Sequence, residues 1–352
     1  MEQIEGAKNS DLGLISTHRN ALMGIAALII CYFHEFLPAA PAGTFLYDAE
    51  DFIIRVSFYG VDVFMLLSGM SVACSLLRKP SVKTFYLRRA KRILPFYFLS
   101  GIVMILMGKW VVSDYFLNIF GINFFIKHVD SYLWFVIAII LFYLAAPLYQ
   151  KLLVKFDKPV LTYLISFAGW YVISLALTGV IRDDFFYAIG RMPVFMLGML
   201  LGNLITTGVK IKYRFAFWTA VVTMFIIGWI MSYMQNYYSY IYLFGTILSV
   251  LPRVCLGFSV PYICAGLLDI IKFKWIGKVF EFFGSFCFEL YIVQKLFDQS
   301  IHYFLQANNI WGIVRNLIML FTLSAIAFLS SRAVNWCVDK IACSLDINKQ
   351  NK

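Results

Sequence analysis

Few ionisable side chains interrupt the long apolar segments of this chain, and those few carry its candidate chemistry. His34 follows the apolar run 24–33, Glu35 comes directly after it, and Asp62 lies early in the next apolar run. Ionisable side chains inside a membrane cost free energy, so they are functional candidates by default. An imidazole titrating near neutral pH can remove the proton of a hydroxyl group, and Glu35 or Asp62 could orient it. The open alternative is a histidine that is only hydrogen-bonded at the outer interface.

A second group of candidates is basic and lies before the first and third apolar runs. The passage 85–95 places four cations in five positions, which are Arg88, Arg89, Lys91 and Arg92. Guanidinium groups bind phosphates well. Arg19 precedes His34 by 15 residues, or about 22 Å along a helix, roughly the span of an extended pantetheine arm. The alternative is that these residues only anchor the chain at the membrane or bind lipid headgroups.

A third group is predicted to pair within the apolar part of the chain. Asp62 needs a partner there, and Arg191 and Arg253 at the ends of two later segments are the expected ones. A structural ion pair and a role in orienting or binding a substrate both remain open. The ninth segment adds Glu289, Gln294 and Lys295.

The composition defines the elements that must position these residues. The chain is 61% hydrophobic and only 14% charged, with a mean hydropathy of +0.79, whereas soluble domains carry about 25% charged residues. A spanning helix needs about 20 mostly apolar residues. The sequence therefore predicts an all-α, polytopic transmembrane bundle of about ten helices at 21–38, 57–77, 93–110, 132–150, 161–179, 185–206, 215–234, 241–270, 284–304 and 311–337. The eighth range is too long for one simple span, so it is either tilted or broken near Gly257 and Pro261.

The positive charges set the predicted topology. Of the 30 Lys and Arg residues, 22 fall in alternate connections and only four in the others, with four more inside or at the edges of helices. Cytoplasmic loops carry the positive excess, so both termini are predicted to be cytoplasmic. We expect a cytoplasmic tail at 1–18, a membrane domain at 19–338 and a second cytoplasmic tail at 339–352. The net charge of +11 is thus a topology signal, and no nucleic-acid partner is expected. The seven cysteines form no CxxC pair, so neither a disulfide framework nor a metal site is predicted.

Six passages in chain order resemble the integral membrane acyltransferase family three, which includes bacterial glycan O-acetyltransferases. Passage 60–70, GVDVFMLLSGM, is very close to the family's GVDVFFVLSGF, and 85–95 is similar to its basic F-x-x-R-R-x-x-R-I-x-P. The other passages are 19–34, 133–147 with its LWF and FYL, 191–198, and 284–291 with its ELY.

The resemblance implies roles for particular residues. The family's essential histidine at the end of the first helix matches His34. The family's arginine eleven residues before that histidine corresponds to Met23 in this chain. Arg19, one helical turn before Met23, is expected to take over the role of that arginine. A histidine common after the ninth-helix motif is Gln294 here, which can hydrogen-bond but cannot titrate. Tyr291 and Trp134 lie in matching motifs and are expected near the acceptor, although Trp134 also suits an interfacial aromatic belt.

The resemblance also implies the reaction. We expect a multi-pass protein of the cytoplasmic membrane that transfers an acyl group, by family default acetyl, from cytoplasmic acyl-CoA to a hydroxyl of a surface or lipid-linked carbohydrate. His34 would act as base directly or after transient acylation, while Arg19, Arg88, Arg89 and Arg92 would hold the phosphates of the donor. The expected partners are acyl-CoA, the carbohydrate acceptor and membrane lipids, with no tightly bound cofactor. The alternative is a transporter or flippase for a lipid-linked glycan, which the lack of an inverted repeat weakens.

Overall fold

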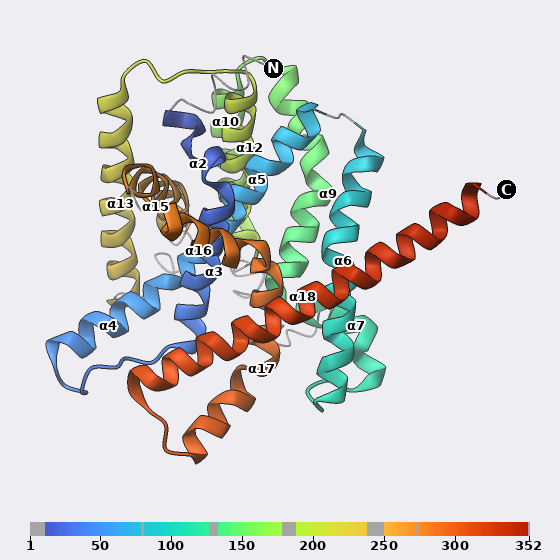
Figure 1. Cartoon of the computed structure of the whole chain (residues 1–352). Coiled ribbons are helices and arrows are strands. Elements are labelled where there is room, and N and C mark those ends of the chain that lie inside the picture. The colour runs from blue at the N-terminus through green and yellow to red at the C-terminus, as the bar shows by residue number, and fades with distance from the viewer. Residues whose placement is uncertain are drawn as a thin grey trace. The chain divides into compact units, whose positions relative to one another are not determined.

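The computed structural model describes residues 11–78, 81–126, 133–177, 188–237, 250–271 and 274–350, and every regular element among them is a helix (Figure 1). This confirms the predicted all-helical class. Five of these helical segments are long and apolar enough to cross a membrane, or six when a pair bent by 71°, Asp11–Thr17 with Arg19–Glu35, counts as one span. The count of ten spans and the cytoplasmic side of both termini remain predictions.

The chain divides into two compact units, each assembled from separate parts of the sequence. The first contains 1–26, 58–85 and 134–284, and the second contains 27–57, 86–133 and 285–352. Among the described residues, three α-helices contribute to both units: α3 (Arg19–Glu35), α6 (Val82–Leu106) and, by its last residue alone, α16 (Lys274–Ser285).

The first unit is organised around two helices that approach closely. Its helices are α2 (Leu14–Thr17), the start of α3, α5 (Gly60–Arg78), α9 (Trp134–Lys155), α10 (Pro159–Leu177), α12 (Met192–Thr206), α13 (Arg214–Tyr237), α15 (Val250–Ile270) and α16 (Lys274–Ser285), the last residue of which belongs to the second unit. A Cβ atom added at Gly198 of α12 would lie 2.1 Å from the carbonyl oxygen of Leu66, and one at Gly69 of α5 would lie 2.1 Å from that of Phe195. Only glycine permits backbones to pack this closely.

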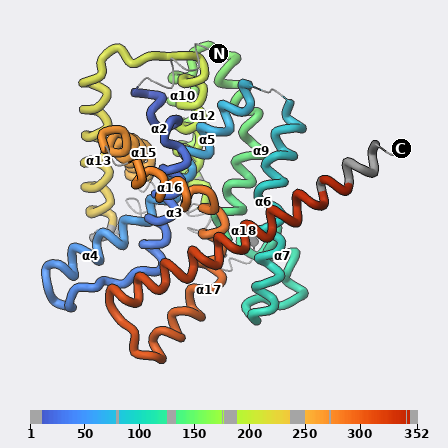
Figure 2. The backbone as a smooth tube through the Cα atoms, in the orientation of Figure 1, coloured from blue at the N-terminus to red at the C-terminus, as the bar shows by residue number. Residues whose placement is uncertain are grey.

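The second unit contains the remaining helices. These are the end of α3, α4 (Phe45–Val56), most of α6, α7 (Tyr115–Ile119), α8 (Ile122–Ile126), α17 (Cys287–Ala307) and α18 (Gly312–Gln350). The Tyr97 hydroxyl of α6 donates to the carbonyl oxygen of Ile119, 2.7 Å away, which fastens α7 to α6. Figure 2 shows α18 as one long segment that is red over most of its length.

Three structural features were left open by the sequence-based expectations. α15 continues through Gly257 and Pro261, so the described part of the eighth range is not broken there. The expected outer loop 39–56 contains α4, which Thr44 caps by accepting a hydrogen bond from the Tyr47 amide at 3.2 Å. Residues 11–17 of the expected tail are packed, because Leu12 is buried and its carbonyl oxygen accepts from the Tyr262 hydroxyl.

Candidate active site

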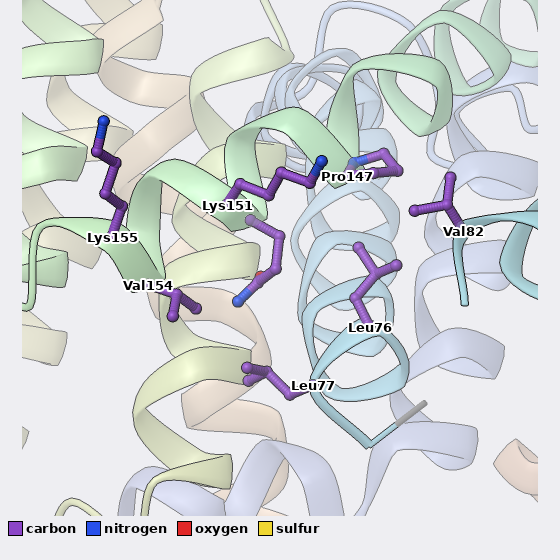
Figure 3. Close-up of a pocket in the computed structure, with 8 residues that line it drawn as sticks. Leu76, Leu77, Val82, Pro147, Lys151, Val154 and Lys155 are labelled. Atoms are coloured by element: carbon purple, nitrogen blue, oxygen red, sulfur yellow. The ribbon is translucent and has the colours of Figure 1, made fainter. Parts of the chain in front are cut away.

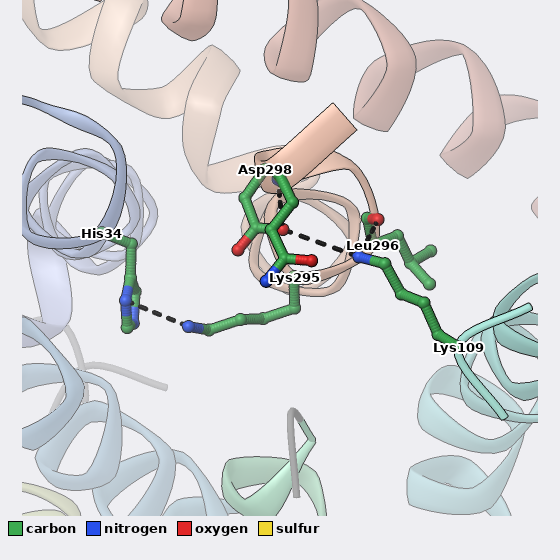
Figure 4. Close-up of polar contacts among 6 residues, drawn as sticks. His34, Lys109, Lys295, Leu296 and Asp298 are labelled. Carbon is green, nitrogen blue, oxygen red and sulfur yellow. Dashed lines mark hydrogen bonds and ion pairs between the residues drawn. The ribbon is translucent and has the colours of Figure 1, made fainter. Parts of the chain in front are cut away.

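His34 lies in the last turn of α3, where its ring meets a lysine from α17. Its Nδ1 is 3.0 Å from Lys295 Nζ, within hydrogen-bond distance (Figure 4). Sequence analysis placed Lys295 among the polar residues of the ninth segment but considered only Glu35 and Asp62 as orienting partners of His34. The contact that holds the imidazole therefore comes from a residue far away in the sequence.

A second lysine fixes α17 next to this contact. Lys109, beyond the end of α6, donates from Nζ to the carbonyl oxygen of Leu296 at 2.7 Å and lies 3.7 Å from Asp298 Oδ1 (Figure 4). Both acceptors are within three residues of Lys295 along α17. The turn of α17 that presents Lys295 to His34 is thus held from the α6 side as well.

The end of α3 is anchored to the beginning of α18 through backbone groups. Arg315 donates from Nη1 to the Glu35 carbonyl oxygen at 2.5 Å, and its Nη2 is 3.0 Å from His302 Nδ1. Asn316 donates to the Leu37 carbonyl oxygen at 2.8 Å and accepts from the Leu37 amide at 3.2 Å. These contacts fix the turn that carries His34. Sequence reasoning missed this role, although an arginine at the edge of an apolar segment was a usable signal.

Glu35 and Gln294 carry buried polar atoms that no described residue is hydrogen-bonded to. Glu35 is 3% exposed, and among the described residues its Oε1 has no hydrogen-bond partner. Gln294 is fully buried, and neither its Nε2 nor its Oε1 is hydrogen-bonded within the same part of the chain. Buried polar groups left unpaired cost about 1–3 kcal/mol each. Gln294, Lys295 and the buried Tyr291 share one side of α17 by their spacing, so a ligand near Lys295 could satisfy the amide.

The basic candidates do not belong to one unit. Arg19, in the first unit, donates from Nε to Ser71 Oγ at 2.5 Å. The other three lie on α6 in the second unit, where Arg88 and Arg92 are exposed and Arg92 interacts electrostatically with Glu289. That these four arginines form one phosphate site remains a prediction.

The predicted pairing of Asp62 with Arg191 is confirmed in the first unit. Asp62 Oδ1 lies 3.6 Å from Arg191 Nε, and both side chains are at most 1% exposed. The Arg191 guanidinium also lies 4.6 Å from the centre of the Trp134 ring, and Arg253 interacts electrostatically with Asp62. Because these groups have almost no accessible surface, the geometry favours a structural ion pair joining α5 and α12 over direct contact with a substrate.

Comparisons with known proteins add one finding. The model of acyltransferase family three, described as an acyltransferase domain, matches residues 20–336. Neither the search of curated proteins nor the search of solved structures found a match. The matched range includes every site residue discussed above except Arg19.

Proposed function

Since the chain belongs to acyltransferase family three, we propose that it transfers an acyl group, acetyl by default, from cytoplasmic acyl-CoA to a hydroxyl of a surface or lipid-linked carbohydrate. The observation that carries this proposal is the hydrogen bond between His34 Nδ1 and Lys295 Nζ at 3.0 Å. A ring held at one nitrogen presents its other nitrogen in a defined direction, as a general base requires.

The proposed reaction begins with proton removal. His34 Nε2 takes the proton of the acceptor hydroxyl while the hydroxyl oxygen attacks the thioester carbonyl carbon. The C–O bond forms, the C–S bond breaks, and the imidazolium returns the proton to the CoA thiolate. The products are an ester of the carbohydrate and free CoA, so atoms and charge balance without a further co-reactant.

The base role requires one particular tautomer of His34. For Nε2 to have a free lone pair, Nδ1 must carry the ring hydrogen and donate it to Lys295 as a neutral amine. In the other tautomer Lys295 donates to Nδ1, Nε2 carries the hydrogen, and His34 would act as a hydrogen-bond donor toward the reacting oxygen. The proposal adopts the first arrangement, in which the lysine is the positioning residue.

Neighbouring groups supply the remaining parts of the proposed site. The amide of Gln294, to which no described residue is hydrogen-bonded, is available to an acceptor hydroxyl or to the thioester oxygen. Arg88, Arg89 and Arg92 are proposed to hold the phosphates of the donor, which agrees with the exposure of Arg88 and Arg92. Arg19 is proposed to assist from the inner end of α3.

The experiment compares the purified protein with its His34→Gln variant. Release of CoA thiol from acetyl-CoA is followed in the presence of cell-envelope glycans, and the glycans are analysed by mass. We expect one acetyl mass per modified hydroxyl with the native protein and a loss of about 10²–10⁴-fold in rate with the variant. Unchanged glycan acetylation by His34→Gln would refute the base role. In cells that lack the protein, loss of glycan export with unchanged acetylation would instead indicate a transporter.

A further inference from the structure

A separate pocket of about 400 Å³ lies in the first unit, where α5 and α9 end (Figure 3). None of the site residues predicted from the sequence lines it. Its walls are mostly apolar and include Leu76 and Leu77 from the last turn of α5, while α9 contributes two cations, Lys151 and Lys155. α5 forms the end of the candidate membrane span Phe45–Arg78, and α9 is a candidate span by itself. The basic ends of both helices are the ones predicted to face the cytoplasm.

One polar side chain in the pocket has no hydrogen-bond partner in the described part of the chain. Gln150 lines the pocket although it is only 6% exposed, and among the described residues neither its Nε2 nor its Oε1 is hydrogen-bonded. A buried amide pays a desolvation penalty unless a ligand or water completes its bonds. The matching ligand must offer both a hydrogen-bond acceptor and a hydrogen-bond donor.

The surface of α9 next to the pocket is amphipathic along its length. Lys151 and Lys155 are exposed and one helical turn apart. Leu144 and Leu148, which are 57% and 67% exposed, precede them on the same face of the helix. The ligand that fits this face has an anionic group at one end and an apolar chain at the other.

We propose that this pocket binds an anionic phospholipid of the cytoplasmic leaflet. Its phosphate lies at Lys151 and Lys155, an ester carbonyl accepts from Gln150 Nε2, and a headgroup hydroxyl donates to Gln150 Oε1. An acyl chain follows Leu148 and Leu144 toward the middle of the membrane. Basic pockets at the cytoplasmic ends of membrane helices recognise such headgroups, whereas a soluble phosphate compound would leave the leucine face unused. The proposal does not depend on the reaction proposed for His34.

The test measures lipid binding to the full-length protein purified in detergent. Mixed micelles containing phosphatidylglycerol or phosphatidylcholine are titrated, and bound lipid is counted by native mass spectrometry while thermal unfolding is followed. We expect saturable binding and stabilisation with phosphatidylglycerol only. The double variant Lys151→Gln/Lys155→Gln weakens this binding about 30-fold, and Gln150→Leu weakens it about fivefold.

The control is the double variant Lys210→Gln/Lys212→Gln, which removes the same charge from exposed residues outside the pocket. We expect it to bind phosphatidylglycerol like the native protein. Equal binding of the two lipids, or equal loss in both double variants, would overturn the proposal. Displacement of bound phosphatidylglycerol by soluble glycerol phosphate or CoA would also overturn it, because the pocket would then be a site for a soluble phosphate compound. Unfolding temperatures without lipid show whether each variant is folded.

Discussion

Replacement of Lys295 by methionine tests how the imidazole of His34 is held. The variant keeps an unbranched apolar chain but removes the group that lies 3.0 Å from His34 Nδ1. A net hydrogen bond contributes about 1–1.5 kcal/mol, which corresponds to about a 5- to 13-fold change in rate when it acts only on the reacting geometry. We therefore expect Lys295→Met to lower kcat by about that factor, with little change in KM for acetyl-CoA.

The assay is CoA thiol release under saturating acetyl-CoA, measured for a double-mutant cycle. If Lys295 acts through His34, its replacement has no further effect, within about twofold, once His34→Gln is present. Lys109→Met serves as the control. It removes a lysine that fixes the same turn of α17 through contacts with Leu296 and Asp298. We therefore expect Lys109→Met to lower the unfolding temperature, with a smaller effect on kcat than Lys295→Met.

Two results would refute this reasoning. Equal losses from Lys295→Met in the native and His34→Gln backgrounds would mean that the lysine acts independently of the imidazole. A rise in KM for acetyl-CoA with unchanged kcat would mean that Lys295 contacts the donor and does not position the base.

Two further predictions concern the packing of the first unit. Gly198→Ala places a methyl group 2.1 Å from the Leu66 carbonyl oxygen and is expected to lower the free energy of unfolding by about 1–3 kcal/mol. The control Gly169→Ala meets no atom within 4 Å and should leave that free energy unchanged or raise it by up to about 1 kcal/mol. Thermal unfolding in detergent distinguishes the two variants, and equal unfolding temperatures would contradict the close packing of α5 and α12. Asp62→Asn removes the carboxylate that lies 3.6 Å from buried Arg191 and is expected to lower the free energy of unfolding by about 3–5 kcal/mol. Adding Arg191→Gln should recover part of this free energy, and no recovery would count against the ion pair.

Local features of the sequence were enough to predict the class of protein and several candidate residues. Apolar segments of spanning length depend on composition over about 20 residues, so the helical membrane class could be predicted without tertiary information. The pairing of Asp62 with Arg191 was also predictable, because few charges lie in the apolar segments and a buried carboxylate requires a cation. Helix α4 and the packed residues 11–17 were missed because their apolar residues are too few for a spanning pattern.

The sequence by itself determined that this is a helical membrane acyltransferase-like chain with His34 at the end of its first long apolar run. Only the tertiary structure decided what surrounds that histidine. Lys295 is 261 residues away from His34 in the sequence, and Arg315 is 280 residues away from Glu35. No periodicity or local motif indicates contacts over such separations. The same holds for the pocket at Gln150. Only the packing of α5 against α9 shows that no described residue is hydrogen-bonded to its amide.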